Sequence, residues 1–552
     1  ADLKNRDFRA LVNIDHFEVV ERWFLKNLIH EVAAKTISTQ DVAAILRKRR
    51  RLHWSAKDDY THLYDAVGFA AKFQDEINRI HIGMENVSEG IRQYSETGFR
   101  IDQIYRKYVY HARKSAQAGL LSALTAEIEN LYSNKFLLPL NDVWQSNVDK
   151  LTKWKIDGFR MQRDIFDKAV RPLRDKSIKV CVLISDAMRF EVGEELQTRI
   201  KALDRFDADL QPAISMLPSY TQLGMASLLP NTSLQIDPKS TAAMVDGMPA
   251  SGLINREKIL STNRSDDRCK ALKYDELMKY TGNDAKALIR DIDILYIYHD
   301  RIDAIGDKPA TEAGVFEAVE NTFDDLVNAV RKLMSANAPR IIITADHGFL
   351  YQHHELDESD YSSATIEGVD VGTINRRFVL GHGLSDDPAM KSFTAEALGL
   401  VGDTEVMIPK SINRLRRSGA GSRFVHGGAS LQEVVIPVLT VTKSRQSDVA
   451  NVEIDVIEGT SRTISTNQLS IRFYQTEAVT EKRQARTLRI GFYSDEGELL
   501  SDQHTITFDA ASENPRDREH ATRLIFSKSA DAYNQKHIFL KLEEPHAGTS
   551  HF

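Results

Sequence analysis

The chain contains an apolar run that ends in an acid, Cys181-Val-Leu-Ile-Ser-Asp-Ala-Met-Arg189. A second run, Ile341-Ile-Ile-Thr-Ala-Asp-His-Gly348, ends in the same way. Short apolar runs that are rich in β-branched residues are typical of buried strands. Ligands of open α/β sheets bind outside the carboxyl ends of the strands, so both acids are expected at a binding edge. The Asp-His pair on the second strand indicates a divalent metal site.

Length and composition describe an ordinary globular protein of 552 residues, 42% hydrophobic and 27% charged. The longest apolar runs are far shorter than the roughly 20 residues of a membrane-spanning helix, so no membrane association is expected. Two cysteines, Cys181 and Cys269, exclude a disulfide framework, and the first residues contain no apolar signal segment. Both observations favour the cytoplasm. The chain starts at Ala1 without a methionine, as expected of a fragment of a longer protein.

Three regions follow one another along the chain. Residues 1–175 show apolar side chains at helical spacing, as in Leu63, Ala66 and Phe73, and are expected to form a helical module. Residues 176–442 alternate apolar strands with helices, which predicts an α/β fold with a doubly wound sheet. Residues 443–552 contain short alternating segments and are expected to form a small β-sandwich. The predicted fold is therefore an α/β core between an all-α module and a β-sandwich.

Polar residues with metal-binding or nucleophilic side chains follow the strands of the α/β region in a fixed order. They are Asp186, Thr221 in Pro218-Ser-Tyr-Thr221, Asp303 and Asp307 in Tyr298-His-Asp-Arg-Ile-Asp-Ala-Ile-Gly-Asp307, Asp346 with His347, and His426 before two glycines. Each has a structural alternative, because Asp186 and Thr221 suit helix caps and the other acids suit solvated turns. A hydroxyl at a helix amino terminus also favours phosphate, which makes Thr221 a candidate nucleophile.

The order of these segments resembles the alkaline phosphatase superfamily, especially its nucleotide pyrophosphatase/phosphodiesterase branch. Within that superfamily the chain is most similar to the PglZ family, the phosphatase-like component of bacteriophage exclusion (BREX) defence systems. Three stretches carry this resemblance: Asp186-Ala-Met-Arg-Phe-Glu191, Leu217-Pro-Ser-Tyr-Thr221 and His426-Gly-Gly-Ala-Ser-Leu-Gln-Glu433. The resemblance covers the α/β region and implies an alkaline-phosphatase-like core.

The resemblance also implies two divalent metals. Asp186, Asp346 and His347 would hold one metal, with the Thr221 oxygen as its fourth ligand. Asp303, Asp307 and His426 would hold the other metal. Zinc is the usual metal of the superfamily, and carboxylate-rich ligation also suits manganese.

The chain departs from the related phosphodiesterases at one position. They have Asp-x-x-Gly-His, whereas this chain has Asp303-Ala-Ile-Gly-Asp307, so a carboxylate replaces an imidazole. His299, four residues before Asp303, is an alternative source of the imidazole. The alignment of Tyr298 and Gly306 favours Asp307.

The resemblance leads to the hypothesis that Thr221 attacks phosphorus and forms a phosphothreonine that water hydrolyses. Threonine in the nucleophile position resembles the diesterase branch, so we predict a phosphodiesterase that acts on nucleotides or DNA. The segment Lys410–Arg423, with five cations before His426, is either a solvated loop or a contact to a phosphate backbone. The alternatives are a phosphomonoesterase and a catalytically silent metal-binding scaffold, which the substitution at Asp307 keeps open.

The flanking regions are expected to serve assembly, because helix stripes and sheet faces are common docking surfaces. The resemblance implies that other BREX components are the partners.

Overall fold

A computed structural model of the protein describes residues 7–14, 16–50, 52–354, 361–417, 421–457 and 463–545. The chain forms two compact units. The larger unit comprises Ala1–Gln197 and Ala208–Thr442, and the smaller unit comprises Thr198–Asp207 and Lys443–Phe552. Among the described helices, none combines the length and the hydrophobicity that crossing a bilayer requires.

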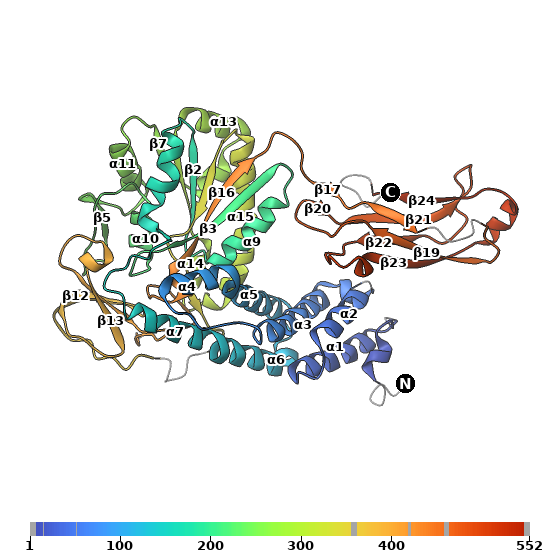
Figure 1. Ribbon diagram of the computed structural model, residues 1–552, viewed down its shortest axis with the longest axis horizontal. Coiled ribbons are helices and arrows are strands. Elements are labelled where there is room, and N and C mark those ends of the chain that lie inside the picture. The colour runs from blue at the N-terminus through green and yellow to red at the C-terminus, as the bar shows by residue number, and fades with distance from the viewer. Residues whose placement is uncertain are drawn as a thin grey trace. The chain divides into compact units, whose positions relative to one another are not determined.

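A seven-stranded mixed sheet forms the centre of the larger unit (Figure 1). The strand order is β1 (Arg160–Met161), β3 (Phe206–Ile214), β16 (Val435–Lys443), β9 (Ile341–Thr344), β2 (Val180–Ser185), β8 (Ile294–His299) and β7 (Cys269–Lys273). β7, β8, β2 and β9 are parallel, whereas β16 is antiparallel to β9. Every residue of β2, β8 and β9 is buried, which explains their continuous apolar sequences. The predicted α/β core is confirmed.

The register of the sheet brings three strand ends to one edge. Ile184 of β2 pairs with Tyr298 of β8 on one side and with Thr344 of β9 on the other. Because parallel neighbours end side by side, the residues that follow these strands start from the same edge. Asp186, Asp346 and the segment after His299 therefore begin close together.

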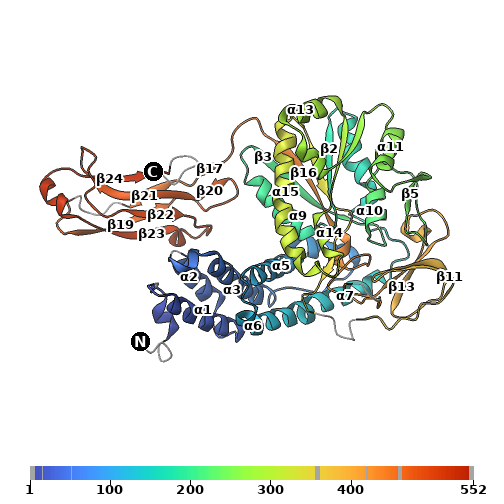
Figure 2. The same ribbon diagram turned by 180° about the vertical axis from the view of Figure 1, so that it is seen from behind.

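Helices cover the sheet. The longest, α15 (Val315–Ser335), lies along the sheet in Figure 2 and buries an apolar stripe at three- and four-residue spacing: Phe316, Val319, Phe323, Leu326, Val330 and Leu333. The other elements of this region are α8 (Arg171–Arg174), α9 (Phe190–Lys201), α10 (Thr221–Ser227), β4 (Leu234–Ile236), β5 (Ala243–Val245), β6 (Met248–Pro249), α11 (Leu253–Asn263), α12 (Tyr274–Lys279), α13 (Gly282–Asp291), α14 (Arg301–Gly306) and α16 (Leu431–Val434).

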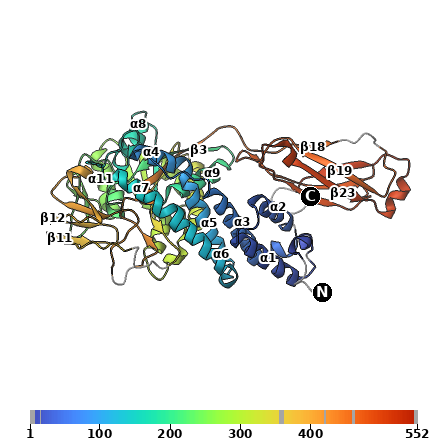
Figure 3. The same cartoon turned by 60° about the horizontal axis from the view of Figure 1, so that its bottom comes forward.

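The N-terminal part of the larger unit is helical, and Figure 3 shows its helices side by side. They are α1 (Glu18–Ala33), α2 (Thr39–Arg49), α3 (Asp58–Glu76), α4 (Val87–Gln93), α5 (Phe99–Lys114), α6 (Ala118–Leu131) and α7 (Leu138–Val148). Arg106 of α5 is fully buried and forms ion pairs with Glu191 and Glu195 of α9 and with Glu320 of α15. This cluster joins the helices to the α/β core.

A small antiparallel sheet that was not predicted from the sequence lies between β9 and β15 (Phe424–Val425) in the chain. Its order is β11 (Gly368–Ile374), β12 (Val379–Leu384), β14 (Glu405–Pro409) and β13 (Met390–Thr394). Its strands are only partly buried at several positions, so their sequences lack the apolar runs that marked the central sheet. The turn between β11 and β12 carries Arg376 and Arg377.

The smaller unit contains two three-stranded antiparallel sheets. One consists of β18 (Ile454–Ile457), β19 (Gln468–Gln475) and β23 (Glu519–Ile525), and the other of β22 (His504–Phe508), β21 (Arg486–Tyr493) and β24 (Phe539–Glu543). Phe473, Leu524, Ile490 and Phe508 meet in one apolar core, so the two sheets form a sandwich. Two further short strands of this unit, β17 (Ala450–Asn451) and β20 (Arg483–Gln484), pair in parallel with each other.

Candidate active site

The ends of β2 and β9 deliver three of the predicted site residues to one point. His347 Nε2 lies 3.6 Å from Asp186 Oδ1 and 3.4 Å from Asp346 Oδ2. All three residues are buried, and their ligand atoms lie within 4.8 Å of one another. The edges of a four-coordinate zinc site with ligand distances near 2.1 Å are about 3.4 Å long, so this spacing suits a metal ion.

Backbone contacts fix which atoms face this point. Asp346 Oδ1 accepts hydrogen bonds from the N–H groups of Ala187 and His347, both at 3.0 Å. His347 Nδ1 lies 2.9 Å from the carbonyl oxygen of Gly348, which can accept only a Nδ1–H. Asp346 Oδ2 and the lone pair of His347 Nε2 are therefore left to face Asp186.

Thr221 reaches the same point from the first position of α10. Its Oγ1 lies 3.1 Å from His347 Nε2. The helix can approach β9 this closely because residue 224 is glycine, where a Cβ atom would overlap the carbonyl oxygen of Asp346. The loop before Thr221 is held by Ser219, whose N–H and hydroxyl donate to the carbonyl oxygens of Gly427 and Gly428.

His426 and Asp303 form a second group with the shared His347. The imidazole rings of His347 and His426 stack at a centroid distance of 4.1 Å and an angle of 9°. His426 Nε2 lies 3.6 Å from Oδ1 of Asp303, a residue of α14. Pairing of β10 (Leu350–Tyr351) with β15 brings the residues after His347 beside the residues before His426. Asp303, His347 and His426 also have ligand atoms within 4.8 Å of one another.

Four buried atoms of these two groups have no hydrogen-bond partner among the described residues. They are Asp186 Oδ1, Asp303 Oδ1, Asp346 Oδ2 and His426 Nδ1. Burial, together with the carboxylates of Asp346 and Asp303, raises the pKa of Asp186, and burial raises the pKa of Asp303 to about 6. Burial also lowers the pKa of His426, which favours the neutral imidazole that binds metals. Since buried unpaired carboxylates are costly, these residues fit a divalent cation as their missing partner.

Asp307 and His299 contact other groups. Asp307 directly follows α14, its side chain is about half exposed, and its Oδ1 accepts a 2.6 Å hydrogen bond from Arg376. His299 is buried, with Nδ1 3.1 Å from Ser185 Oγ and Nε2 3.1 Å from Asp325 Oδ2. Neither residue belongs to the described groups of close ligand atoms, and the assignment of Asp307 as a ligand stays a prediction.

Arg189, beside the site, and two cations of the segment Lys410–Arg423 have structural partners. Arg189 is fully buried, and its guanidinium lies 2.6 Å from Asp102 of α5. Lys410 forms an ion pair with Asp149, and buried Arg414 donates to Gln352. Residues 418–420 of the predicted basic segment lie outside the described residues.

Three supporting residues were not predicted from the sequence: Gln162, Glu433 and Arg377. Gln162 donates through Nε2 to the carbonyl oxygens of Ala345 and Asp346 and thereby holds the end of β9. Glu433 caps α16 and forms a fully buried ion pair with Arg377. Only Glu433 had a sequence signal, since Ser430-Leu-Gln-Glu433 is a capping box, whereas nothing near Gln162 or Arg377 pointed to the site.

Two curated relatives match 94% of the chain: the alkaline phosphatase-like protein BrxZ of Escherichia coli O9:H4 (strain HS), 33% identical over 538 residues, and the alkaline phosphatase-like protein PglZ of Bacillus cereus (strain H3081.97), 31% identical over 530 residues. The chain spans only 61% and 60% of their lengths.

Among solved structures, murine ectonucleotide pyrophosphatase/phosphodiesterase 5 matches 48% of the chain and 88% of its own, with 11% identity and a TM-score of 0.33. Phosphonoacetate hydrolase from Sinorhizobium meliloti 1021 matches 48% of the chain and 90% of its own, with 13% identity and a TM-score of 0.31. Residues 165–441 match the BREX system PglZ alkaline phosphatase-like domain. The chain belongs to the PglZ family.

Proposed function

We propose that the chain is a metal-dependent phosphodiesterase that acts on nucleotides or DNA as part of a BREX defence system. One observation carries the proposal: the Thr221 hydroxyl lies 3.1 Å from His347 Nε2, beside buried carboxylate oxygens without hydrogen-bond partners. The family and the names of the curated relatives support alkaline-phosphatase-like chemistry.

Asp186, Asp346, His347 and Thr221 would hold one divalent ion, and Asp303 and His426 would hold the other. Asp307 joins the second set only by releasing Arg376. Zinc suits the mixture of carboxylates and imidazoles best, and manganese is the alternative. When bound, such ions supply positive charge for the attacking and leaving oxygens of an in-line displacement.

Thr221 performs the covalent step in this proposal. Its Oγ1 gives its proton to solvent and attacks phosphorus, and the bond between phosphorus and the oxygen of the leaving alcohol breaks, with that oxygen taking up a proton from solvent. Water then cleaves the bond between phosphorus and Thr221 Oγ1, which releases the remaining phosphomonoester and restores the hydroxyl. Gly224 and Ser219 hold Thr221 in place for both steps, because they set the position of α10 and its preceding loop.

Two alternatives each have an observation in their favour. The positive charge of Arg376 opposes the rise that burial causes in the pKa of Asp303 and adds to the fall in the pKa of His426, so this charge acts at the candidate site. A phosphomonoester dianion needs such extra positive charge, which favours a phosphomonoesterase. A catalytically silent scaffold is favoured by the ion pair that engages Asp307. Other BREX components are the proposed partners in each case.

Replacement of Thr221 by Ala tests the nucleophile. We expect kcat on bis-p-nitrophenyl phosphate to fall by about 1000-fold or more, because loss of a nucleophile removes the covalent route. Thr221→Ser, which keeps a hydroxyl, should retain measurable turnover. Metal analysis of both variants must show unchanged zinc for the comparison to be valid. Undiminished turnover by Thr221→Ala would refute the assignment.

Parallel assays on p-nitrophenyl phosphate and plasmid DNA separate the alternatives. Faster hydrolysis of the monoester identifies a phosphomonoesterase, and bound metal without turnover of any of the three substrates identifies a scaffold.

A further inference from the structure

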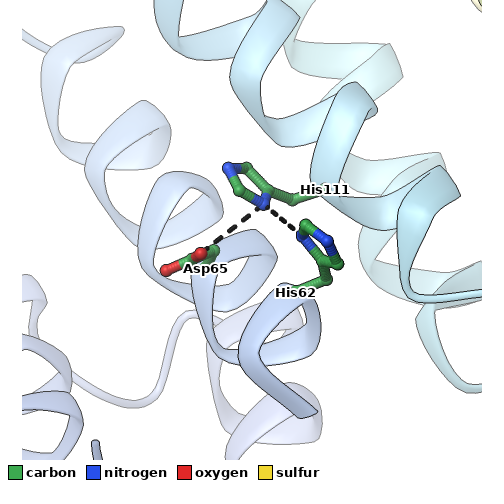
Figure 4. A group of neighbouring side chains, drawn as sticks. All are labelled: His62, Asp65 and His111. Carbon is green, nitrogen blue, oxygen red and sulfur yellow. Dashed lines mark hydrogen bonds and ion pairs between the residues drawn. The ribbon is translucent and has the colours of Figure 1, made fainter. Parts of the chain in front are cut away.

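A second cluster of metal-ligand side chains lies in the helical part of the larger unit, outside the candidate active site. His62 and Asp65 belong to α3, and His111 belongs to the neighbouring α5 (Figure 4). Residues three apart share one face of a helix, so His62 and Asp65 point together toward α5. Ligand atoms of the three residues lie within 4.8 Å of one another.

The distances within this cluster suit one metal ion. His62 Nδ1 lies 2.9 Å from His111 Nδ1, and His111 Nδ1 lies 3.5 Å from Asp65 Oδ2. Ligand atoms of a tetrahedral zinc site lie about 3.4 Å apart, so a shift of roughly half an ångström between the two imidazoles would complete the geometry. The same 2.9 Å contact can hold one shared proton, which is the alternative that the experiment below distinguishes.

The surroundings favour ligation. Phe69 stacks on the His111 ring at a centroid distance of 5.4 Å, and Tyr110 meets the His62 ring edge-on. Arg50 pairs with Asp65 through Oδ1, which leaves Oδ2 toward His111.

A solvent path reaches the cluster, because the side chains of Asp65 and His111 are 19% and 17% exposed. Two imidazoles and one carboxylate with a fourth position open to water form a donor set that suits zinc, and the order of divalent affinities also admits copper and nickel.

We propose that His62, Asp65 and His111 bind one zinc-type divalent ion that joins α3 to α5. The site is independent of the phosphoesterase proposal, since no residue is shared between the two. Its function is structural: an ion bound by both helices ties together two elements that otherwise meet through side-chain packing.

The test measures metal on the full chain after removal of all metals with a chelator. The apo protein is titrated with Co²⁺ or Zn²⁺ alone, and the bound metal per chain is measured by inductively coupled plasma mass spectrometry. His62→Gln, Asp65→Asn and His111→Gln should each bind one equivalent less than the parent and lose part of the visible Co²⁺ absorption. His30→Gln, at an exposed position on α1, is the matched control and should bind as the parent does.

Because the result is a difference between variants, it does not depend on how many ions the candidate active site holds. Asp65→Asn preserves size and is the variant to judge if His111→Gln does not fold by circular dichroism. A second readout localises the ion: Zn²⁺ should slow hydrogen exchange in α3 and α5 of the parent but not of Asp65→Asn. Equal metal content and equal Co²⁺ spectra in the parent and Asp65→Asn would overturn the proposal and leave a shared proton between His62 and His111.

Discussion

Among single residues, backbone hydrogen bonds decide which side-chain atoms of the candidate site remain available to bind an ion. Asp346 has one carboxylate oxygen held by two N–H groups and the other without a hydrogen-bond partner among the described residues. His347 has Nδ1 committed to a carbonyl oxygen and Nε2 directed toward Asp186 and Thr221. These contacts orient the donors before any ion arrives, which reduces the cost of binding one.

A buried acid away from the site predicts a pH dependence of stability. Burial raises the pKa of Glu129 in α6 to about 7 from its ordinary value of 4.5, although Tyr105 donates a 2.7 Å hydrogen bond to it. The folded protein therefore binds a proton more tightly than the unfolded chain does. This residue's contribution is fully present below pH 4.5 and is lost as the pH rises to about 7, on the order of 3 kcal/mol.

Glu129→Gln should remove this dependence, because the amide carries no titrating proton. Urea unfolding of the larger unit at pH 5 and pH 8 measures the effect. We expect the free energy of unfolding of the parent to fall more between pH 5 and pH 8 than that of the variant does. The same difference between parent and variant at both pH values would contradict the raised pKa of Glu129.

At the scale of elements, the position of the short helix α10 determines where the proposed nucleophile lies. Gly224 allows α10 to pack on the backbone of Asp346, and the Ser219 contacts hold the loop before it. Neither strand β9 nor helix α10 alone places Thr221 near His347. Their close packing does, and it depends on a residue without a side chain.

Gly224→Ala should therefore displace Thr221 while the rest of the unit stays folded. An added methyl group overlaps the Asp346 carbonyl oxygen, and a displacement near 1 Å can reduce kcat about 100-fold. Kinetics on bis-p-nitrophenyl phosphate and a thermal melt measure the two effects. Gly119→Ala is the control, since a Cβ atom at position 119 of α6 meets nothing within 4 Å. Equal kcat values for both variants would show that the packing of α10 does not position Thr221.

At the scale of the whole molecule, one buried arginine joins the helical part of the larger unit to its α/β core. Arg106 of α5 pairs with Glu191, Glu195 and Glu320, which come from two helices of the core. Nearby, Asp102 of α5 pairs with Arg189, three residues after Asp186. The helical part thus contacts the segment that carries a candidate metal ligand.

Arg106→Ala should destabilise the larger unit by about 3–5 kcal/mol, because it leaves buried carboxylates without their cation. Chemical denaturation measures this loss, and zinc content reports whether the candidate active site is affected as well. Arg100→Ala on the exposed side of α5 is the matched control and should change stability by about 0.5 kcal/mol or less. A small effect of Arg106→Ala would show that the two parts are held together by apolar packing instead.

The α/β class, the family and the edge of the sheet at which acids gather could all be predicted from the sequence. Continuous apolar runs are a local property of the sequence, and acids that follow such strands are expected at one edge of a parallel sheet, so Asp186 and Asp346 could be predicted to lie together. Thr221, Asp303 and His426 could also be named as candidates, through motifs whose order resembled a known family.

Contacts between residues that lie far apart in the chain could not be predicted from the sequence and became visible only in the folded protein. In the structure, Arg376 donates a hydrogen bond to Asp307, and Gln162 donates one to the end of β9. His299 contacts Ser185 and Asp325. The fold also brings His111 within reach of His62, 49 residues earlier. Periodicity reports which face of an element is buried, but which partner meets that face is set by the packing of whole helices and sheets.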